Sequence, residues 1–570
     1  MTYRGDLHFT LAVARSRKKE ENNKMASLKE LPYPVVNSVL EYLPVVDILE
    51  MAKVFPDWKI NALTLLKYVR IDPSTPYGGS WRLYNEGAVN DDKIATDILA
   101  FIDDLVEVTD NMEHFYLCTN LIHSSGIIKL LSTQKAIKSL VVSYKRYRRK
   151  EDPPEAATEV GDALVQGIIK HEKSLEKIDL GVEEYSYSFE ALANAFKDRQ
   201  TCFPNLKSME LVSSTACAYS SYDSDKGFKE REFQQAQIMF SKMFVGAHIQ
   251  ELNFKPKLEM VFYDGKEVFW QARYVQMMLQ YFTNGAFSNL RKINIDSLNT
   301  RGILGEFSDA DAQLLIENCP HISHIDSDVL FFDKDSYRYP VQDEKPLIKI
   351  IKHYGPQIVY LNCYTSTNIV NSISENCPHL EAITLVDDFN DGLTDSSLMA
   401  LSCLKNLKKL KLFLHRVEIT PAAVIEFLDK NISKLQNLSI EFLDTVSVPN
   451  ILKYIGLNGK NLQKIQISFM YKEEDEFYKA MTEGLLQMLN GCREVRSLIF
   501  IADRETNVHS ANEETRHAFL ESCTNLLISG FKNLKYLQIR AGYCFEKEQM
   551  ESLRKSKPNC RIEFSGRIDK

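Results

Sequence analysis

Apolar residues recur along most of the chain at positions i, i+3 and i+5, usually just after a short loop that contains Asn, Cys or Pro. Leu407, Leu410 and Leu412 form one such set. The alternation at the end of each set is typical of a β-strand with one buried face. Fifteen candidate strands follow, centred on Phe115, Leu140, Ile178, Met209, Leu252, Ile293, Ile325, Leu361, Ile383, Leu410, Leu438, Ile465, Leu498, Leu537 and Ile562.

Stretches with helical periodicity separate these strands, most clearly at residues 395–404 and 421–432. Thr420 is a suitable N-cap for the second helix, and Pro421 suits its first turn. Strand centres lie 27 or 28 residues apart between Ile383 and Ile465. Elsewhere the spacing reaches about 40 residues, which indicates longer helices, inserted loops or misassigned units. Residues 213–233 are the best candidate for an insertion.

The residue between the last two apolar positions separates a one-sided repeat sheet from an ordinary parallel sheet covered on both faces. A sheet covered on both faces should be apolar there as well. Twelve of the fifteen residues are polar, so we predict an α/β solenoid with helices on one face and an open binding face on the other. The fifteen are Tyr116, Val141, Asp179, Glu210, Asn253, Asn294, Asp326, Asn362, Thr384, Lys411, Ser439, Gln466, Ile499, Gln538 and Glu563.

Two units share the phrases "ENCPHI" (residues 317–322) and "ENCPHL" (375–380), with looser relatives at 490–495 and 521–526. These units resemble leucine-rich repeats of the longer, helix-containing, cysteine-bearing kind. The resemblance implies that Cys319 and Cys377 pack in the helix-to-strand turn, and they have no metal-spaced ligand partners. It also implies that the concave face holds another protein. Our candidate residues for that contact are Glu210, Asn253, Asn294, Asn362, Lys411, Gln466 and Gln538.

A hydrophobic segment at residues 31–58 precedes the repeats. Its pattern predicts three short helices: one over residues 34–43, a second over about 46–53, and a third that begins near Asp57 and includes Leu66. Three helices of this size form a marginal core, so part of their apolar surface should be buried against a partner.

The spacing within this segment resembles the F-box. The Leu-Pro pair, the Val-Leu and Tyr-Leu pairs, and the later Asp, Val and Trp fall on family positions without a gap. They are Leu31, Pro32, Val39, Leu40, Tyr42, Leu43, Asp47, Val54 and Trp58. Pro34 and the sequence Phe55-Pro56-Asp57 depart from the family pattern. A helix–turn–helix segment that matches by chance is the alternative.

The resemblance implies a substrate-recognition subunit of an SCF-type (cullin–RING) ubiquitin ligase. The F-box would dock on a Skp-type adaptor, which connects it to a cullin, while the repeats bind a substrate protein. The implied adaptor contacts are Leu31, Pro32, Val36, Val39, Leu40, Leu43 and Leu49. The alternative is a leucine-rich-repeat scaffold that acts outside a ubiquitin ligase.

Composition and motif searches exclude several other classes. The net charge of −8 argues against a general nucleic-acid binder. No apolar run approaches the ~20 residues that span a bilayer. Nucleotide-binding, hydrolase and zinc-protease motifs are missing, so we expect no enzyme activity, no cofactor and no metal. His321 and His324 have no nearby carboxylate cluster, which favours a structural or solvent-exposed role.

Eleven cysteines without a C-x-x-C motif suit a reducing compartment, the cytoplasm or the nucleus. The basic cluster at residues 145–150 is expected to be a solvated loop, with a nuclear-localisation signal as the alternative.

The expected organisation is a disordered leader at 1–27, with a weak transit peptide or nuclear signal as the alternative for this segment. The F-box at 28–70, a linker and cap at 71–111 and a leucine-rich-repeat solenoid at 112–570 follow.

Overall fold

A computed structural model describes most of the chain between Tyr68 and Phe564. The described residues are 68–71, 91–118, 122–143, 154–181, 203–213, 237–238, 241, 244, 247–256, 262–263, 266–267, 281, 285–295, 308–326, 344–387, 393–414, 419–442, 448–471, 475–504, 513–541 and 547–564. The predicted leader (1–27), the F-box segment (31–58), the basic cluster (145–150) and residues 214–233 of the candidate insertion lie outside them.

Sixteen parallel strands form one sheet whose spatial order follows the sequence, and β7 and β8 form a separate antiparallel pair. The strands are β1 (Tyr68–Ile71), β2 (His114–Cys118), β3 (Ser139–Ser143), β4 (Lys177–Gly181), β5 (Ser208–Ser213), β6 (Glu251–Pro256), β7 (Phe262–Tyr263), β8 (Lys266–Glu267), β9 (Lys292–Ile295), β10 (His324–Asp326), β11 (Tyr360–Thr365), β12 (Ala382–Asp387), β13 (Lys409–Leu414), β14 (Asn437–Phe442), β15 (Lys464–Tyr471), β16 (Ser497–Arg504), β17 (Tyr536–Ala541) and β18 (Arg561–Phe564).

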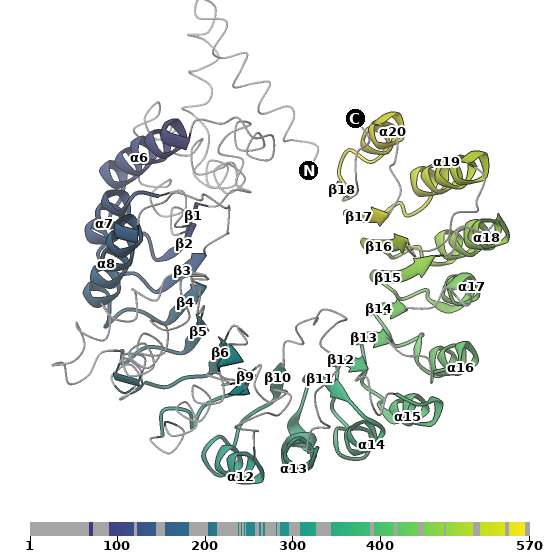
Figure 1. The fold of residues 1–570 in the computed structure, drawn as a ribbon, viewed down its shortest axis with the longest axis horizontal. Coiled ribbons are helices and arrows are strands. Elements are labelled where there is room, and N and C mark those ends of the chain that lie inside the picture. Colours follow the sequence, from purple (N-terminus) through teal and green to yellow (C-terminus); the bar gives the residue numbers. More distant parts are fainter. Residues whose placement is uncertain are drawn as a thin grey trace, which may run out of the picture.

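Helices connect most of these strands, and Figure 1 shows them along the outside of an arc whose inner side is the sheet. They are α6 (Asp91–Val108), α7 (Ser124–Thr133), α8 (Pro154–Lys170), α12 (Asp309–Asn318), α13 (Lys345–Tyr354), α14 (Thr367–Asn376), α15 (Asp395–Ala400), α16 (Pro421–Asn431), α17 (Val448–Asn458), α18 (Asp475–Gly491), α19 (Glu513–Ser529) and α20 (Lys547–Ser556), with 3-10 turns η5 (Gly355–Gln357) and η6 (Leu401–Cys403). The chain is therefore an α/β repeat solenoid.

All fifteen predicted strands are present, so the i, i+3, i+5 pattern identified them correctly. The sheet also contains β1, which lies at the end of the range assigned to the F-box and was not predicted. The sequence carried a signal for β1, because Leu66, Val69 and Ile71 have the same spacing as the other units. The predicted third helix of the F-box segment includes Leu66, so this spacing was not assigned to a strand.

The clearest helix predictions are confirmed. The hydroxyl of Thr420 accepts a hydrogen bond from the backbone N–H of Ala423 at 3.2 Å, and α16 begins at Pro421. Residues 395–403 form α15 and η6. The longer spacing near the C-terminus comes from longer helices, since α18 and α19 have 17 residues each and α16 has 11.

Backbone hydrogen bonds at the start of the strands fix the repeats against one another. The carbonyl of the residue just before a strand accepts two N–H groups from the next repeat. Glu381 O, for example, accepts from Lys408 N at 2.8 Å and from Lys409 N at 3.0 Å. Thirteen such entrance carbonyls, from Glu113 to Arg496, make this double contact. This double contact allows only one register between neighbouring strands.

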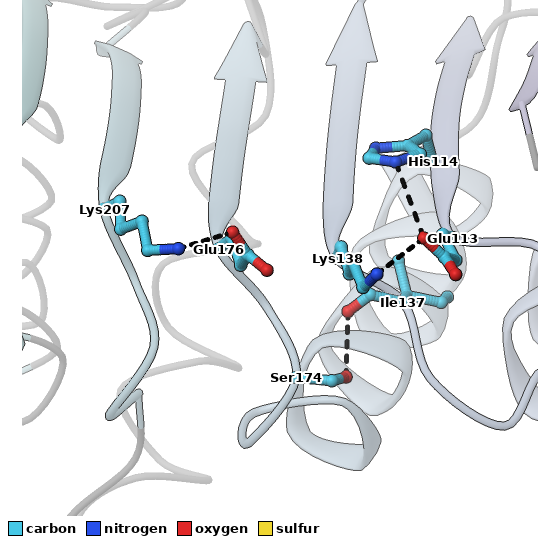
Figure 2. A network of polar contacts seen from close by, with 7 residues as sticks. All are labelled: Glu113, His114, Ile137, Lys138, Ser174, Glu176 and Lys207. Atoms are coloured by element: carbon cyan, nitrogen blue, oxygen red, sulfur yellow. Dashed lines mark hydrogen bonds and ion pairs between the residues drawn. The ribbon is translucent and has the colours of Figure 1, made fainter.

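Polar side chains in the helix-to-strand turns add a second link between repeats. The amide of an asparagine in the turn donates to a backbone carbonyl of the preceding turn, as from Asn461 to Ser433 O at 2.7 Å. Asn205 and Asn406 make equivalent contacts at 2.7 and 3.0 Å. Figure 2 shows a hydroxyl in the same role, where Ser174 donates to Ile137 O at 2.8 Å. These turns are thereby tied to the ones before them.

Cysteines close three of the turns. Cys319 and Cys377 are the C-caps of α12 and α14, and both are fully buried, as is Cys492 after α18. The hydroxyl of Tyr354 on α13 donates to the carbonyls of Leu315 and Cys319, each at 2.9 Å. These positions are consistent with a packing role for the cysteines.

The looser phrase at residues 521–526 does not lie at a turn. Cys523 lies inside α19, and that helix continues to Ser529. Gly530 and Phe531 make the turn, with Phe531 at φ 41° in the left-handed region that commonly ends helices. The side chain of Phe531 is buried at 2% exposure, so hydrophobic contact offsets that backbone conformation.

The rate of alkylation should distinguish the buried cysteines from an exposed one. Burial raises the pKa of Cys319, Cys377 and Cys492 to about 12, so almost no thiolate is present near neutral pH. We expect iodoacetamide to label exposed Cys403 in the native protein and to leave these three unlabelled until denaturant is added. Mass spectrometry of digested protein measures the labelling, and native labelling of Cys319 as fast as Cys403 would contradict the packing.

Helices α17 and α18 approach at backbone distance. An ideal Cβ on Gly491 would lie 1.5 Å from the carbonyl oxygen of Gly456, and one on Gly456 would lie 2.4 Å from the carbonyl oxygen of Gln487. Because the obstructing atoms belong to the backbone, neither helix can accept a side chain there without moving. These glycines allow the two outer helices to pack this closely.

Gly491→Ala should lower the free energy of unfolding by about 2–3 kcal/mol, the usual cost of overpacking. Urea unfolding followed by circular dichroism measures this. Asn490→Ala is the matched control, since Asn490 is exposed one residue earlier in α18 and should change stability by less than about 0.5 kcal/mol. Equal stability of the two variants would show that α17 and α18 separate more easily than the structure implies.

Candidate protein-binding surface

One residue from each of the sixteen strands lies in a single register line across the sheet, which we call the middle row. It contains all fifteen residues that the sequence placed between the last two apolar positions, together with Arg70 of β1. In spatial order they are Arg70, Tyr116, Val141, Asp179, Glu210, Asn253, Asn294, Asp326, Asn362, Thr384, Lys411, Ser439, Gln466, Ile499, Gln538 and Glu563.

The middle row belongs to the face of the sheet opposite the helices, which we call the open face. Side chains alternate along a strand, so Lys411 points away from its neighbours Leu410 and Leu412, which are at most 2% exposed. Most middle-row side chains with a described burial are half-buried, Lys411 and Gln466 among them. Figure 1 shows no described helix along the inner side of the arc. The described helices therefore leave the open face uncovered.

The seven candidate contact residues all lie on the middle row but fall into two groups. Glu210, Asn253 and Asn294 come from the adjacent strands β5, β6 and β9, and Asn362 follows on β11. Lys411, Gln466 and Gln538 lie farther along, on β13, β15 and β17. Their binding role stays a prediction. Our candidate set omitted Asp326, although it was one of the twelve polar positions, and the structure places it between Asn294 and Asn362.

Asn294, Asp326 and Asn362 form an amide cluster on β9, β10 and β11. The amide nitrogen of Asn362 donates to a carboxylate oxygen of Asp326 at 2.6 Å. Both asparagines are more than nine-tenths buried, with exposures of 8% and 9%. Only three buried side-chain oxygens among the described residues have no hydrogen-bond partner: Oδ1 of Asn294, Oδ1 of Asn362, and the hydroxyl of Ser372 on α14.

An unsatisfied buried acceptor costs about 1–3 kcal/mol. Two of them, on either side of Asp326 in the middle row, leave the amide cluster able to accept N–H or O–H donors from a partner. Backbone N–H groups and the side chains of Lys and Arg are donors of this kind. The amide cluster thus offers hydrogen bonding to a protein ligand rather than a catalytic arrangement.

His324 lies next to the amide cluster on β10, two residues before Asp326. Its ring stacks on Tyr360 of β11 with centroids 6.2 Å apart, and Nδ1 lies 2.9 Å from the hydroxyl of Ser323. Burial and the nearby charge of Lys292 lower the pKa of His324, which favours the neutral imidazole. His321 is exposed in the preceding turn. The part of the chain that the structure describes contains no His, Cys, Asp and Glu group arranged to hold a metal ion.

The open face also contains apolar side chains on β13 and β16. Phe413 lies two positions after Lys411 on β13, is 4% exposed, and carries the ammonium of Lys411 4.2 Å from its ring centroid. Ile499 and Ile501 are half-buried on the same face of β16. The i, i+3, i+5 pattern marks only one open-face position in each strand, so it did not identify Phe413 or Ile501. The alternation along the strand was the signal that could have found them.

Comparisons with known proteins give no family. No family model matches the chain, and no curated protein matches it. Among solved structures, a chain in the crystal structure of the Rad7 and Elc1 complex in yeast aligns with TM-score 0.29 and 13% identity over 91% of each chain. The leucine-rich-repeat-containing protein LegL7 from Legionella pneumophila aligns with TM-score 0.30 and 15% identity, over 58% of this chain and 93% of that chain. Scores this low carry no inference about function.

The sheet, its outer helices and the continuous middle row define the class of this chain: an α/β repeat solenoid. Its described helices include none that is both long and apolar enough to cross a membrane.

Asn294→Leu should raise the free energy of unfolding by about 1 kcal/mol, because it removes a buried acceptor that lacks a partner. Urea unfolding of the purified chain measures the change. Gln466→Leu is the control, since Gln466 occupies the same middle row but is only half-buried, and its substitution should be nearly neutral. A loss of stability in Asn294→Leu would mean that Oδ1 of Asn294 is satisfied in solution.

Proposed function

We propose that this chain is a non-catalytic substrate-recognition subunit of an SCF-type ubiquitin ligase. The open face binds a substrate protein, and the F-box segment at residues 31–58 docks on a Skp-type adaptor that leads to a cullin. Ubiquitin transfer would belong to the conjugating enzyme in the same complex. A ligase of this kind would act in the cytoplasm, the nucleus or both.

The observation that supports substrate binding is the middle row itself. Sixteen residues from sixteen strands are aligned on a face without described helices, and two buried acceptors near its centre lack partners. Backbone and basic side-chain donors of a protein segment match those acceptors. The support for the ligase half is the F-box resemblance of residues 31–58, which lie outside the described residues.

A leucine-rich-repeat scaffold outside a ubiquitin ligase is the second candidate. It needs only the open face, so the amide cluster favours it as much as the ligase subunit. The two proposals differ in one measurable property, which is adaptor and cullin binding.

Affinity purification of the full chain separates them. We expect the adaptor and the cullin to co-purify, and we expect Leu31→Ala combined with Pro32→Ala to abolish their recovery because it removes the implied docking contacts. The matched control is Asn37→Ala combined with Glu41→Ala, two polar changes within the same segment. Quantitative mass spectrometry measures recovery, and the circular dichroism spectrum reports whether the repeats remain folded.

The same purification tests the open face. Asn294→Leu combined with Asn362→Leu should deplete a set of substrate proteins while adaptor recovery stays unchanged, and Gln466→Leu serves as the control. Recovery that survives the Leu31 and Pro32 substitutions would rule out the docking surface. A wild-type chain that recovers partners but neither adaptor nor cullin would support the scaffold instead.

A further inference from the structure

The turns that lead into the last six strands concentrate positive charge. We consider the six residues that precede the central apolar residue of each strand from β13 to β18. They contain twelve basic residues and one acidic residue, Glu494. The twelve, which we call the basic edge, are Lys405, Lys408, Lys409, Lys434, Lys460, Lys464, Arg493, Arg496, Lys532, Lys535, Lys557 and Arg561. The whole chain has a net charge of −8, so the rest of it carries −19.

Parallel strands in register place these turns side by side along one edge of the sheet. The entrance carbonyls establish this directly, since Arg496 N donates to Gln463 O and Lys535 N donates to Arg496 O, both at 2.8 Å. Nine of the twelve side chains are exposed, including Lys464, Arg496 and Lys535. Like charges therefore repeat about every 4.8 Å along this edge.

In the first nine turns of the same edge, basic and acidic residues nearly balance. The corresponding positions before β2–β6 and β9–β12 contain seven basic and six acidic residues. Figure 2 shows two of the resulting ion pairs between adjacent turns, Lys138 with Glu113 and Lys207 with Glu176, each at 2.7 Å. Lys135 pairs with Asp110 and Lys292 with Glu251 in the same way.

The basic edge has little of this compensation. Lys408 pairs with Glu381 at 2.8 Å, across the boundary with the neutral part of the edge. Eight others have no ion pair with a carboxylate of the described chain: Lys405, Lys409, Lys460, Lys464, Arg493, Arg496, Lys532 and Lys535. The charge segregation is a property of these six turns and not of the repeat itself.

We propose that the basic edge is a second protein-binding site, which takes a short carboxylate-rich segment of a partner protein. This site lies outside the middle row and does not depend on the function proposed for the open face. Five steps of about 4.8 Å span about 24 Å, which an extended segment of about seven residues covers. Alternate side chains of such a segment lie about 6.8 Å apart, so three or four Asp or Glu residues would face the basic edge.

Nucleic acid fits these observations less well. A long polyanion would run past the basic edge onto a chain that carries −19 elsewhere, whereas a short acidic segment would not. Single strands are usually held by aromatic side chains that stack on bases. The aromatic residues of the six turns are Phe531, which is buried, and Tyr536, whose hydroxyl contacts Gln538 and whose ring lies under Arg561.

The test uses the full chain and a fluorescent peptide of about eight glutamates, matched to the length of the edge. We expect binding by fluorescence anisotropy at low ionic strength that weakens as salt is added, with no binding of the corresponding glutamine peptide. Lys464→Gln, Arg496→Gln and Lys535→Gln together should weaken binding about tenfold, as three exposed ion pairs would.

The matched control removes the same charge from the outer helices of the same repeats. Lys479→Gln, Arg554→Gln and Lys555→Gln change exposed residues of α18 and α20, and affinity should stay within about twofold. Unfolding curves of both triple variants should match the wild type. An equal effect of the two sets, or no binding of the glutamate peptide, would overturn the proposal. Tighter edge-dependent binding of a short DNA duplex at the same salt would replace it with a nucleic-acid site.

Discussion

The double hydrogen bond at each entrance carbonyl is the constraint on which the other features of this solenoid depend. One carbonyl accepts the N–H groups of two successive residues in the next repeat, thirteen times between Glu113 and Arg496. A shift of one residue would break both bonds and would turn the apolar face of that strand outward. Helices of 6 to 18 residues and inserted segments are accommodated because they lie outside this line of contacts.

Both candidate binding surfaces are consequences of that fixed register. The middle row brings Asn294, Asp326 and Asn362 together although the two asparagines are 68 positions apart in sequence. The same register places the residue before each strand beside its counterpart in the next turn. Where turn residues of opposite sign lie side by side they form ion pairs, as Glu113 and Lys138 do. Where most charged turn residues are basic, as before β13–β18, they form a charged edge. A fold that cannot slip cannot relieve that repulsion by moving a strand.

Sequence periodicity was sufficient for the strands and insufficient for the contacts between them. The i, i+3, i+5 spacing is a local property of one strand, so all fifteen predictions hold, and β1 was missed only because Leu66 was assigned to another segment. Cys523 shows the limit of phrase matching, because its helix extends beyond the position where a similar phrase ends α12 and α14. Burial of Asn294 and Asn362 depends on packing across neighbouring repeats, which no local pattern contains.

The two surfaces require opposite chemistry from a partner. The amide cluster has two acceptor oxygens without donors. Because these oxygens are buried, each missing hydrogen bond costs about 1–3 kcal/mol. The basic edge has exposed cations, whose mutual repulsion is weakened by water and salt and costs far less. Binding at the amide cluster should therefore depend on geometry and contribute specificity, because only a correctly placed donor satisfies a buried acceptor. Binding at the basic edge should depend on charge and contribute mainly to the rate of association.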